Sequence, residues 1–258
     1  MRRRGYAIFR TDRLVTPIPG IDFSPALLGG PTITFTISFS LSEVSEVDHF
    51  VARGEELTKI HDVLGEGTGR RTAVVHGLGG MGKTQLAAAY AKRHRNNYSA
   101  VLWLNAQDET SLKQSFARVA KRILREHPSV VYMKTAVESC DLDEAVGAVK
   151  RWLDQPKNDS WLLIYDNHDN PKLEGDGRAK QSGGPDEGEE ESDEDAITTK
   201  AYEIKSFLPD THHGAILITT RSSAVRGKLI PLGKLTNIED GLKILSCTSG
   251  REARREGM

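Results

Sequence analysis

The sequence predicts a three-layer α/β domain with a mostly parallel β-sheet. Short, continuous apolar segments recur along the chain, and stretches with helical spacing of apolar residues separate them. Parallel strands covered by helices on both faces read as uninterrupted apolar runs, because neither face meets water. The alternation of such runs with amphipathic helices therefore indicates one α/β domain.

Four strands and at least three helices are expected. The strand segments are short apolar runs rich in β-branched residues, whereas the helical segments carry strong helix formers or apolar residues at steps of three and four. The expected strands are 72–76, 100–104, 161–165 and 215–219, and the expected helices include 85–92, 112–124 and 142–153.

The bulk composition excludes some classes of protein. The chain has 258 residues, a formal net charge of -1 and a mean hydropathy of -0.44. No apolar run approaches the roughly 18 residues that span a membrane, and the balanced charge gives no indication of a nucleic-acid partner. Cys140 and Cys247 form no metal or redox motif, so reduced thiols and a cytoplasmic location are expected. Five arginines among the first 13 residues leave a mitochondrial transit peptide as the alternative.

Three segments differ from the α/β pattern. Residues 1–48 contain Pro and Gly breakers and are expected to be a partly disordered arm, with one possible strand at 33–41, where apolar residues alternate with Thr and Ser. Residues 172–200 are rich in Gly, Ser and acids and are expected to be a disordered insertion, since they cannot bury enough apolar surface. Residues 251–258 form a charged tail, which leaves 49–250 as the predicted domain.

A glycine-rich loop lies between the first expected strand and the first expected helix. Residues 77–84 read GLGGMGKT and fit the phosphate-binding pattern G-x-x-x-x-G-K-[ST]. The glycines let backbone N–H groups turn onto phosphate oxygens, the lysine brings a positive charge, and the threonine hydroxyl can bind Mg²⁺. We therefore expect a P-loop NTPase that binds ADP or ATP with Mg²⁺. The residues expected to hold the nucleotide here are Gly77, Gly79, Gly80, Met81, Gly82, Lys83, Thr84 and Gln85.

An acidic residue ends the third expected strand. Because α/β sheets bind ligands at the carboxyl ends of their strands, Asp166 is predicted to hold Mg²⁺ together with Thr84. An acid that only caps the next turn is the alternative. The following residue is Asn167, which can hydrogen-bond a water molecule but cannot accept its proton as a carboxylate can. We therefore expect slow ATP hydrolysis or none.

The fourth expected strand ends in Thr219, Thr220 and Arg221 at the same edge of the sheet. A guanidinium carries a fixed charge and paired donors, which suit contact with a γ-phosphate. Arg221 is therefore a candidate catalytic residue beside Lys83 and Asp166. The alternative is a surface arginine paired with an acid.

These motifs in this order resemble the NB-ARC domain of STAND-class signalling ATPases, the switch module of NOD-like receptors, in a form close to fungal members. The resemblance covers about residues 50–246 and implies that Val51 and Arg53 contact the base and ribose, largely through their backbone. Ala52 stands where the family commonly has glycine, and the family's further C-terminal elements do not follow Leu245. The resemblance thus implies a truncated member or a gene-model artefact. It rests on the phosphate loop and on segments 50–57, 101–106, 161–170 and 207–221.

Three functions follow from the sequence as hypotheses. The first is a nucleotide-dependent signalling switch with weak or no ATP hydrolysis, as the resemblance implies. The second is a metabolic P-loop ATPase or kinase, for which the sequence shows neither a substrate pocket nor a base. The third is a non-catalytic fragment that associates with itself or with full-length NLR-type proteins through the alternating segment at 33–41.

Overall fold

The computed structural model describes residues 35–41, 44, 50, 53–65, 67, 69–171, 201–235, 239, 241, 242 and 244. The chain divides into two compact units, Met1–Thr34 and Phe35–Met258, and every described residue belongs to the second. The predicted acidic insertion at 172–200 and the predicted tail at 251–258 lie outside the described residues, as do Val51 and most of the predicted N-terminal arm.

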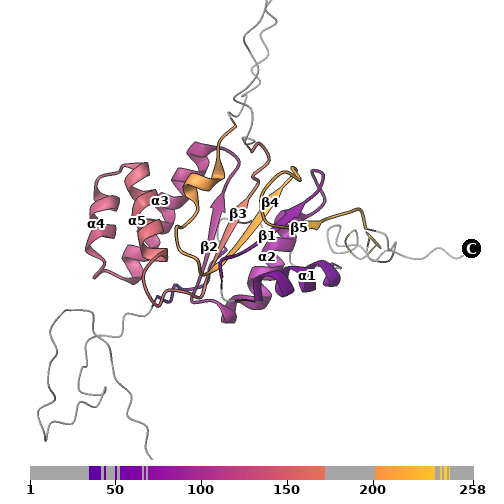
Figure 1. Ribbon diagram of the computed structural model, residues 1–258, viewed down its shortest axis with the longest axis horizontal. Helices are drawn as coiled ribbons and strands as arrows, with labels where there is room; N and C mark the ends of the chain where they lie inside the picture. Colours follow the sequence, from indigo (N-terminus) through magenta and orange to yellow (C-terminus); the bar gives the residue numbers. More distant parts are fainter. Residues whose placement is uncertain are drawn as a thin grey trace, which may run out of the picture. The chain divides into compact units, whose positions relative to one another are not determined.

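A five-stranded, fully parallel β-sheet forms the centre of the described domain (Figure 1). Its strand order is β2-β3-β4-β1-β5, so β4 lies between β1 and β3. The four predicted strands are confirmed to within one residue at each end, and β5 is additional. The strands are β1 (Arg71–His76), β2 (Ala100–Asn105), β3 (Trp161–Asp166), β4 (Ala215–Thr220) and β5 (Lys228–Pro231).

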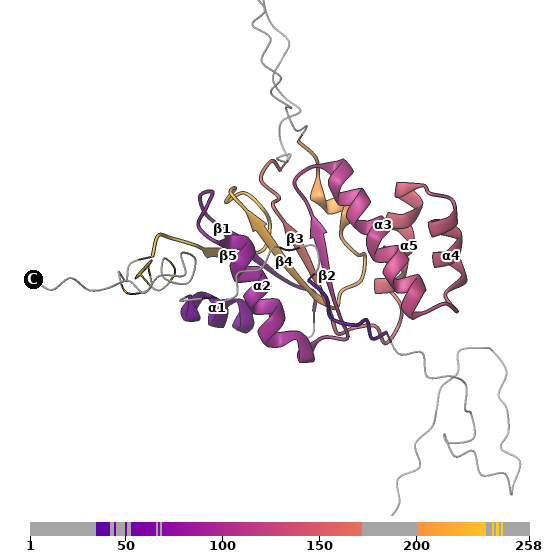
Figure 2. The same cartoon turned by 180° about the vertical axis from the view of Figure 1, so that it is seen from behind.

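Helices cover both faces of the sheet, which confirms the predicted three-layer α/β class (Figures 1 and 2). Two of them, α1 and α2, lie on one face, and the other three lie on the opposite face. None of the helices described is long and apolar enough to cross a membrane. The helices are α1 (Gly54–Gly65), α2 (Lys83–His94), α3 (Glu109–Glu126), α4 (Val131–Glu138) and α5 (Leu142–Leu153), with short 3-10 helices η2 (Arg95–Asn97) and η3 (Ile204–Phe207).

Two apolar cores fill the spaces between the three layers. Neighbouring residues of β1 alternate between them: Val74 packs on the side of α3 to α5, whereas Ala73 and Val75 pack on the side of α1 and α2. The strands β3 and β4 are buried along their whole length. Each buried side chain of valine or leucine size contributes about 1.5–3 kcal/mol to the stability of the fold. The burial of β3 and β4 therefore fixes the position of their carboxyl ends.

The predicted strand at 33–41 is wrong over its described part, since residues 35–41 adopt no regular secondary structure. Their side chains do alternate in burial, and Ile37 and Leu41 are only 4% and 7% exposed. The Ile37 N–H donates to the Ser99 carbonyl at 2.8 Å, and the Ser38 N–H and hydroxyl both donate to Glu126. The segment is thus anchored on its own domain, which leaves little apolar surface for the predicted self-association.

Gly214 fixes the approach of the chain to β4. Its φ is 84°, and a Cβ there would lie 2.4 Å from the ring of Trp161. We expect Gly214→Ala to lower the free energy of unfolding by about 3 kcal/mol, because the positive φ and the overlap both oppose a side chain. Gly147→Ala, at an exposed position of α5 with no atom within 4 Å, is the matched control and should raise it by up to about 1 kcal/mol. Urea denaturation measures the free energy of unfolding of both variants, and equal values would contradict this prediction.

Candidate functional site

The phosphate-binding loop runs from the end of β1 at His76 to the start of α2 at Lys83. Gly80 and Gly82 have φ values of 75° and 83°, which favour glycine although a side chain would meet no atom within 4 Å. Gly77 is required for a different reason, because a Cβ there would lie 2.5 Å from the carbonyl oxygen of Leu232. The Leu232 N–H donates to the His76 carbonyl at 2.8 Å, so the chain after β5 lies against the start of the loop.

The Lys83 ammonium lies within the loop. Its Nζ donates to the carbonyl oxygens of Gly77 at 2.9 Å and Leu78 at 3.0 Å, and the residue is 9% exposed. Burial lowers the pKa of Lys83, while the carboxylate of Asp169 opposes that shift. The predicted contact of Lys83 with the phosphates of a nucleotide stays a prediction.

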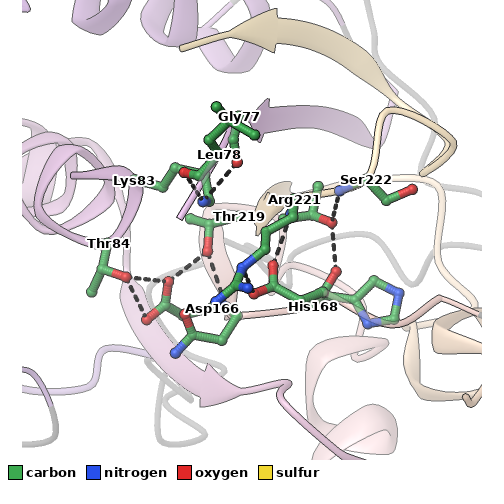
Figure 3. A network of polar contacts seen from close by, with 12 residues as sticks. Gly77, Leu78, Lys83, Thr84, Asp166, His168, Thr219, Arg221 and Ser222 are labelled. Atoms are coloured by element: carbon green, nitrogen blue, oxygen red, sulfur yellow. Dashed lines mark hydrogen bonds and ion pairs between the residues drawn. The ribbon is translucent and has the colours of Figure 1, made fainter. Parts of the chain in front are cut away.

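The Asp166 carboxylate lies at the centre of the site (Figure 3). The Thr84 hydroxyl donates to its two oxygens at 2.9 and 3.1 Å, and the Thr219 hydroxyl donates to Oδ1 at 2.5 Å. Burial raises the pKa of Asp166, and the two hydroxyl hydrogen bonds partly offset this effect. The two predicted metal ligands, Thr84 and Asp166, are therefore in direct contact across 82 residues of sequence.

Arg221 lies beside the phosphate loop but is engaged by an acid. Its Nε pairs with Asp169 Oδ2 at 2.8 Å, and its backbone N–H donates to Asp169 Oδ1 at 2.7 Å. The guanidinium carbon lies 3.5 Å from the position that a Cβ on Gly79 would occupy. Both sequence interpretations thus describe part of the geometry: the side chain is 65% exposed and paired with an acid, and it borders the loop.

The two residues that follow Asp166 differ in burial. Asn167 has a φ of 66° and an exposed side chain, and its N–H donates to the Thr219 hydroxyl at 3.0 Å. His168 is fully buried, with its carbonyl accepting from the Thr220 hydroxyl at 2.5 Å. Asparagine tolerates a left-handed backbone, so this turn explains its presence without any role in catalysis.

The structure also describes three further residues that are predicted to contact the nucleotide, Arg53, Met81 and Gln85. Met81 packs partly against the core under α2, and Gln85 lies in the first turn of that helix. Arg53 has a φ of 68°; its guanidinium pairs with Glu56 at 3.1 Å and donates from Nη2 to the Gly233 carbonyl at 2.7 Å. The start of α1 is therefore tied to the segment that follows β5.

Sequence reasoning missed the contact of Thr219 with Asp166, and it did not identify Asp169 as the acid that pairs with Arg221. Both depend on β4 lying next to β3, and the order of parallel strands is set by crossovers that local sequence does not specify. The only available signal was the polar end of each strand, at Asp166 and at Thr219 to Arg221.

The sequence of this chain is similar to an ATPase domain family and to an NLR-like protein. A family model described as AAA ATPase domain matches residues 49–218. A nucleotide-binding leucine-rich repeat (NLR)-like protein of Hyaloscypha variabilis is 28% identical over 185 residues, which cover 67% of this chain and 16% of that protein. The crystal structure of Cdc6p from Pyrobaculum aerophilum aligns with 86% of this chain and 52% of its own, at 13% identity and a TM-score of 0.45.

Proposed function

This chain belongs to the AAA ATPase domain family, and from that premise we propose that it is a nucleotide-binding switch module of the NB-ARC type. The family model and the NLR-like relative both support the NB-ARC resemblance. The module binds ADP or ATP with Mg²⁺ and hydrolyses ATP slowly or not at all. The observation that carries the proposal is the contact between Thr84 and Asp166 beside the loop that holds Lys83.

The residues present fit a Mg²⁺–nucleotide complex. Thr84 and Asp166 offer two oxygen ligands, and the described residues contain no group of three or more His, Cys, Asp or Glu side chains that could hold a metal alone. Mg²⁺ commonly binds through one or two protein oxygens together with phosphates and water, so a pair of ligands suffices. When bound, the ion neutralises charge on the phosphates.

The present hydrogen bonds of Lys83 favour its binding to an anion. Its two present acceptors are neutral carbonyl oxygens, at Gly77 and Leu78, and a phosphate oxygen would replace them with a charge-assisted hydrogen bond. The Lys83 side chain is 9% exposed, so it is already held at the loop before a phosphate binds. The loop's N–H groups complete the cradle at the start of α2, where the helix dipole also favours negative charge.

The same geometry supports slow hydrolysis. Asn167 is exposed and cannot take a proton from water, and Asp169 is held by both the side chain and the backbone of Arg221. Asp166 serves the metal in the proposal. None of these three residues is therefore placed as a free general base.

The switch would act through contacts that a γ-phosphate can disturb. Arg221 borders Gly79 of the loop, so a γ-phosphate would compete with Asp169 for the guanidinium. The loop also touches Leu232, and Arg53 holds the Gly233 carbonyl, so a shift of the loop reaches the chain after β5. The NLR-like relative suggests that this module serves an NLR-type protein, in which further domains would read the change.

Hydrogen exchange with ADP and with a non-hydrolysable ATP analogue tests this function. We expect different protection of the amides at 219–222 and 232–235 in the two states. Protection of α4, which lies at the end of the domain away from β1 and α2 (Figure 1), should be equal and is the internal control. Phosphate release should be far slower than the roughly 10 s⁻¹ that is typical of enzymes. Identical exchange in both states, or turnover at that typical rate, would contradict the switch.

A further inference from the structure

The Asp169 carboxylate makes two contacts with a single residue, Arg221, at the carboxyl end of β4. Its Oδ2 pairs with the Arg221 Nε at 2.8 Å, and its Oδ1 accepts from the Arg221 backbone N–H at 2.7 Å. One acid thus holds both the side chain and the main chain of the same arginine. The two side chains are 28% and 65% exposed, so the ion pair is open to solvent.

Three hydrogen bonds fix the turn that carries Asp169 without using its carboxylate. The His168 N–H donates to the Thr219 carbonyl at 2.9 Å, and the Thr220 hydroxyl donates to the His168 carbonyl at 2.5 Å. The Asp169 N–H donates to the Asn167 carbonyl at 2.8 Å. The side chain of Asp169 can therefore be changed while these three contacts, which place the turn beside the end of β4, are kept.

The ion pair lies next to the phosphate-binding loop. The guanidinium carbon and Nη2 of Arg221 lie 3.5 and 3.6 Å from the position that a Cβ on Gly79 would occupy. Burial lowers the pKa of Lys83, the Asp169 carboxylate raises it and the Arg221 guanidinium lowers it, so both partners act on the ammonium within the loop. Figure 3 shows both Lys83 and Arg221 at this edge of the sheet. A phosphate group bound at the loop would therefore meet the guanidinium and the carboxylate together.

The two partners act on a phosphate in opposite ways. A guanidinium attracts a phosphate and can donate two parallel hydrogen bonds to it, whereas a carboxylate repels it and competes for the same donors. Exposed ion pairs are weak and typically shift an equilibrium by no more than about fivefold. A γ-phosphate, with three acceptor oxygens, can thus replace Asp169 on the guanidinium. ADP has no γ-phosphate, so its binding leaves the ion pair in place.

We propose that Asp169 is a positioning residue that occupies Arg221 in the place of a γ-phosphate and thereby lowers the affinity of the site for ATP relative to ADP. The inference rests on the proposed nucleotide site and adds the residue that sets its preference. Binding of ATP breaks the contact between the carboxylate and Nε, whereas binding of ADP does not, so only ATP binding loses the energy of the ion pair. An acid that merely fixed the end of β4 through the Arg221 N–H would affect both nucleotides equally.

The ratio of the Kd for ADP to the Kd for a non-hydrolysable ATP analogue measures this preference. Isothermal calorimetry with Mg²⁺ on nucleotide-stripped protein gives both constants. Asp169→Asn removes the charge but keeps an oxygen that can accept from the Arg221 N–H, and we expect it to raise the ratio at least about threefold above wild type. The affinity for ADP should change less than about twofold, because salt screens the charge of Asp169 from the other phosphates.

Arg221→Ala separates release of the arginine from simple loss of a negative charge. All measurements use about 0.5 M salt, at which the Debye length is about 4 Å, so repulsion beyond direct contact is screened. Under these conditions Asp169→Asn should change the ratio less than about twofold in the Arg221→Ala background. Asp210→Asn is the matched control, because Asp210 is an exposed acid that pairs with Lys150 at 3.6 Å before the start of β4. It should leave the ratio as in wild type.

Three results would overturn the proposal. They are an equal ratio in wild type and folded Asp169→Asn, a lower ratio in that variant, and an equal rise of the ratio in the Arg221→Ala background. Thermal unfolding shows whether Asp169→Asn is folded, and Asp169→Ser, whose hydroxyl can also accept from a backbone N–H, takes its place if it is not. Binding of ADP with an unchanged ratio contradicts this inference alone, whereas a wild-type chain that binds neither nucleotide overturns the proposed function as well.

Discussion

Lys83→Ala is expected to weaken the binding of both ADP and ATP at least about 100-fold. The ammonium is the one cation that donates into the loop in the described site, and hydrogen bonds to charged groups are worth about 1.5–3 kcal/mol each. A loss of about 2.7 kcal/mol corresponds to that factor. Removal of the side chain also leaves the Gly77 and Leu78 carbonyls without their present donor.

Isothermal calorimetry on nucleotide-stripped protein measures this loss. Lys92→Ala is the matched control, because it removes the same side chain from an exposed position of the same helix, α2, and should bind as wild type does. Thermal unfolding without nucleotide separates loss of affinity from loss of fold. Equal affinities of folded Lys83→Ala and wild type would remove Lys83 from the site.

Asp166→Asn is expected to abolish the effect of Mg²⁺ on ATP binding. In wild type the ion should strengthen ATP binding by about tenfold, or 1.4 kcal/mol, since Asp166 and Thr84 hold it against the phosphates. An asparagine keeps the volume and one acceptor for the Thr219 hydroxyl but loses the charge that retains the ion. The variant should therefore bind ATP with nearly the same affinity with and without Mg²⁺.

Titrations with Mg²⁺ and with a chelator give this comparison directly. Asp159→Asn is the matched control, because Asp159 is an exposed acid two residues before the strand that ends in Asp166. A full magnesium effect in Asp166→Asn would show that another group holds the metal. It would also favour the interpretation in which Asp166 only receives hydroxyl hydrogen bonds from Thr84 and Thr219.

Sequence alone predicted the central strands because burial on both faces leaves a local signature. The segments at 161–165 and 215–219 are continuous apolar runs, and the structure buries β3 and β4 completely. The strand β5 has no such signature, since only Ile230 of its four residues is buried. The alternation of apolar residues at 33–41 predicted the alternate burial of side chains in the described part, 35–41. It did not predict correctly that the segment is a strand, because alternate side chains can be buried without backbone pairing to a neighbouring strand.

The features of the candidate site also fall into those with a local sequence signal and those without one. The loop residues and Asp166 could be predicted, since each belongs to a local strand-turn pattern. The contacts of Thr219 with Asp166, of Asp169 with Arg221 and of Arg53 with Gly233 span from 52 to 180 residues of sequence. Those pairings follow from strand order and from the path of the chain after β5, which composition and spacing do not determine.

The most direct test is a calorimetric titration of the nucleotide-stripped wild-type chain with ADP and ATP in the presence of Mg²⁺. The sample should retain residues 35–41, because Ile37 and Leu41 contribute to the cores of the domain. The account predicts one saturable site with a Kd in the micromolar range or tighter, about 8 kcal/mol of binding free energy. Folded protein that binds neither nucleotide up to roughly millimolar concentration, about 4 kcal/mol, would contradict it.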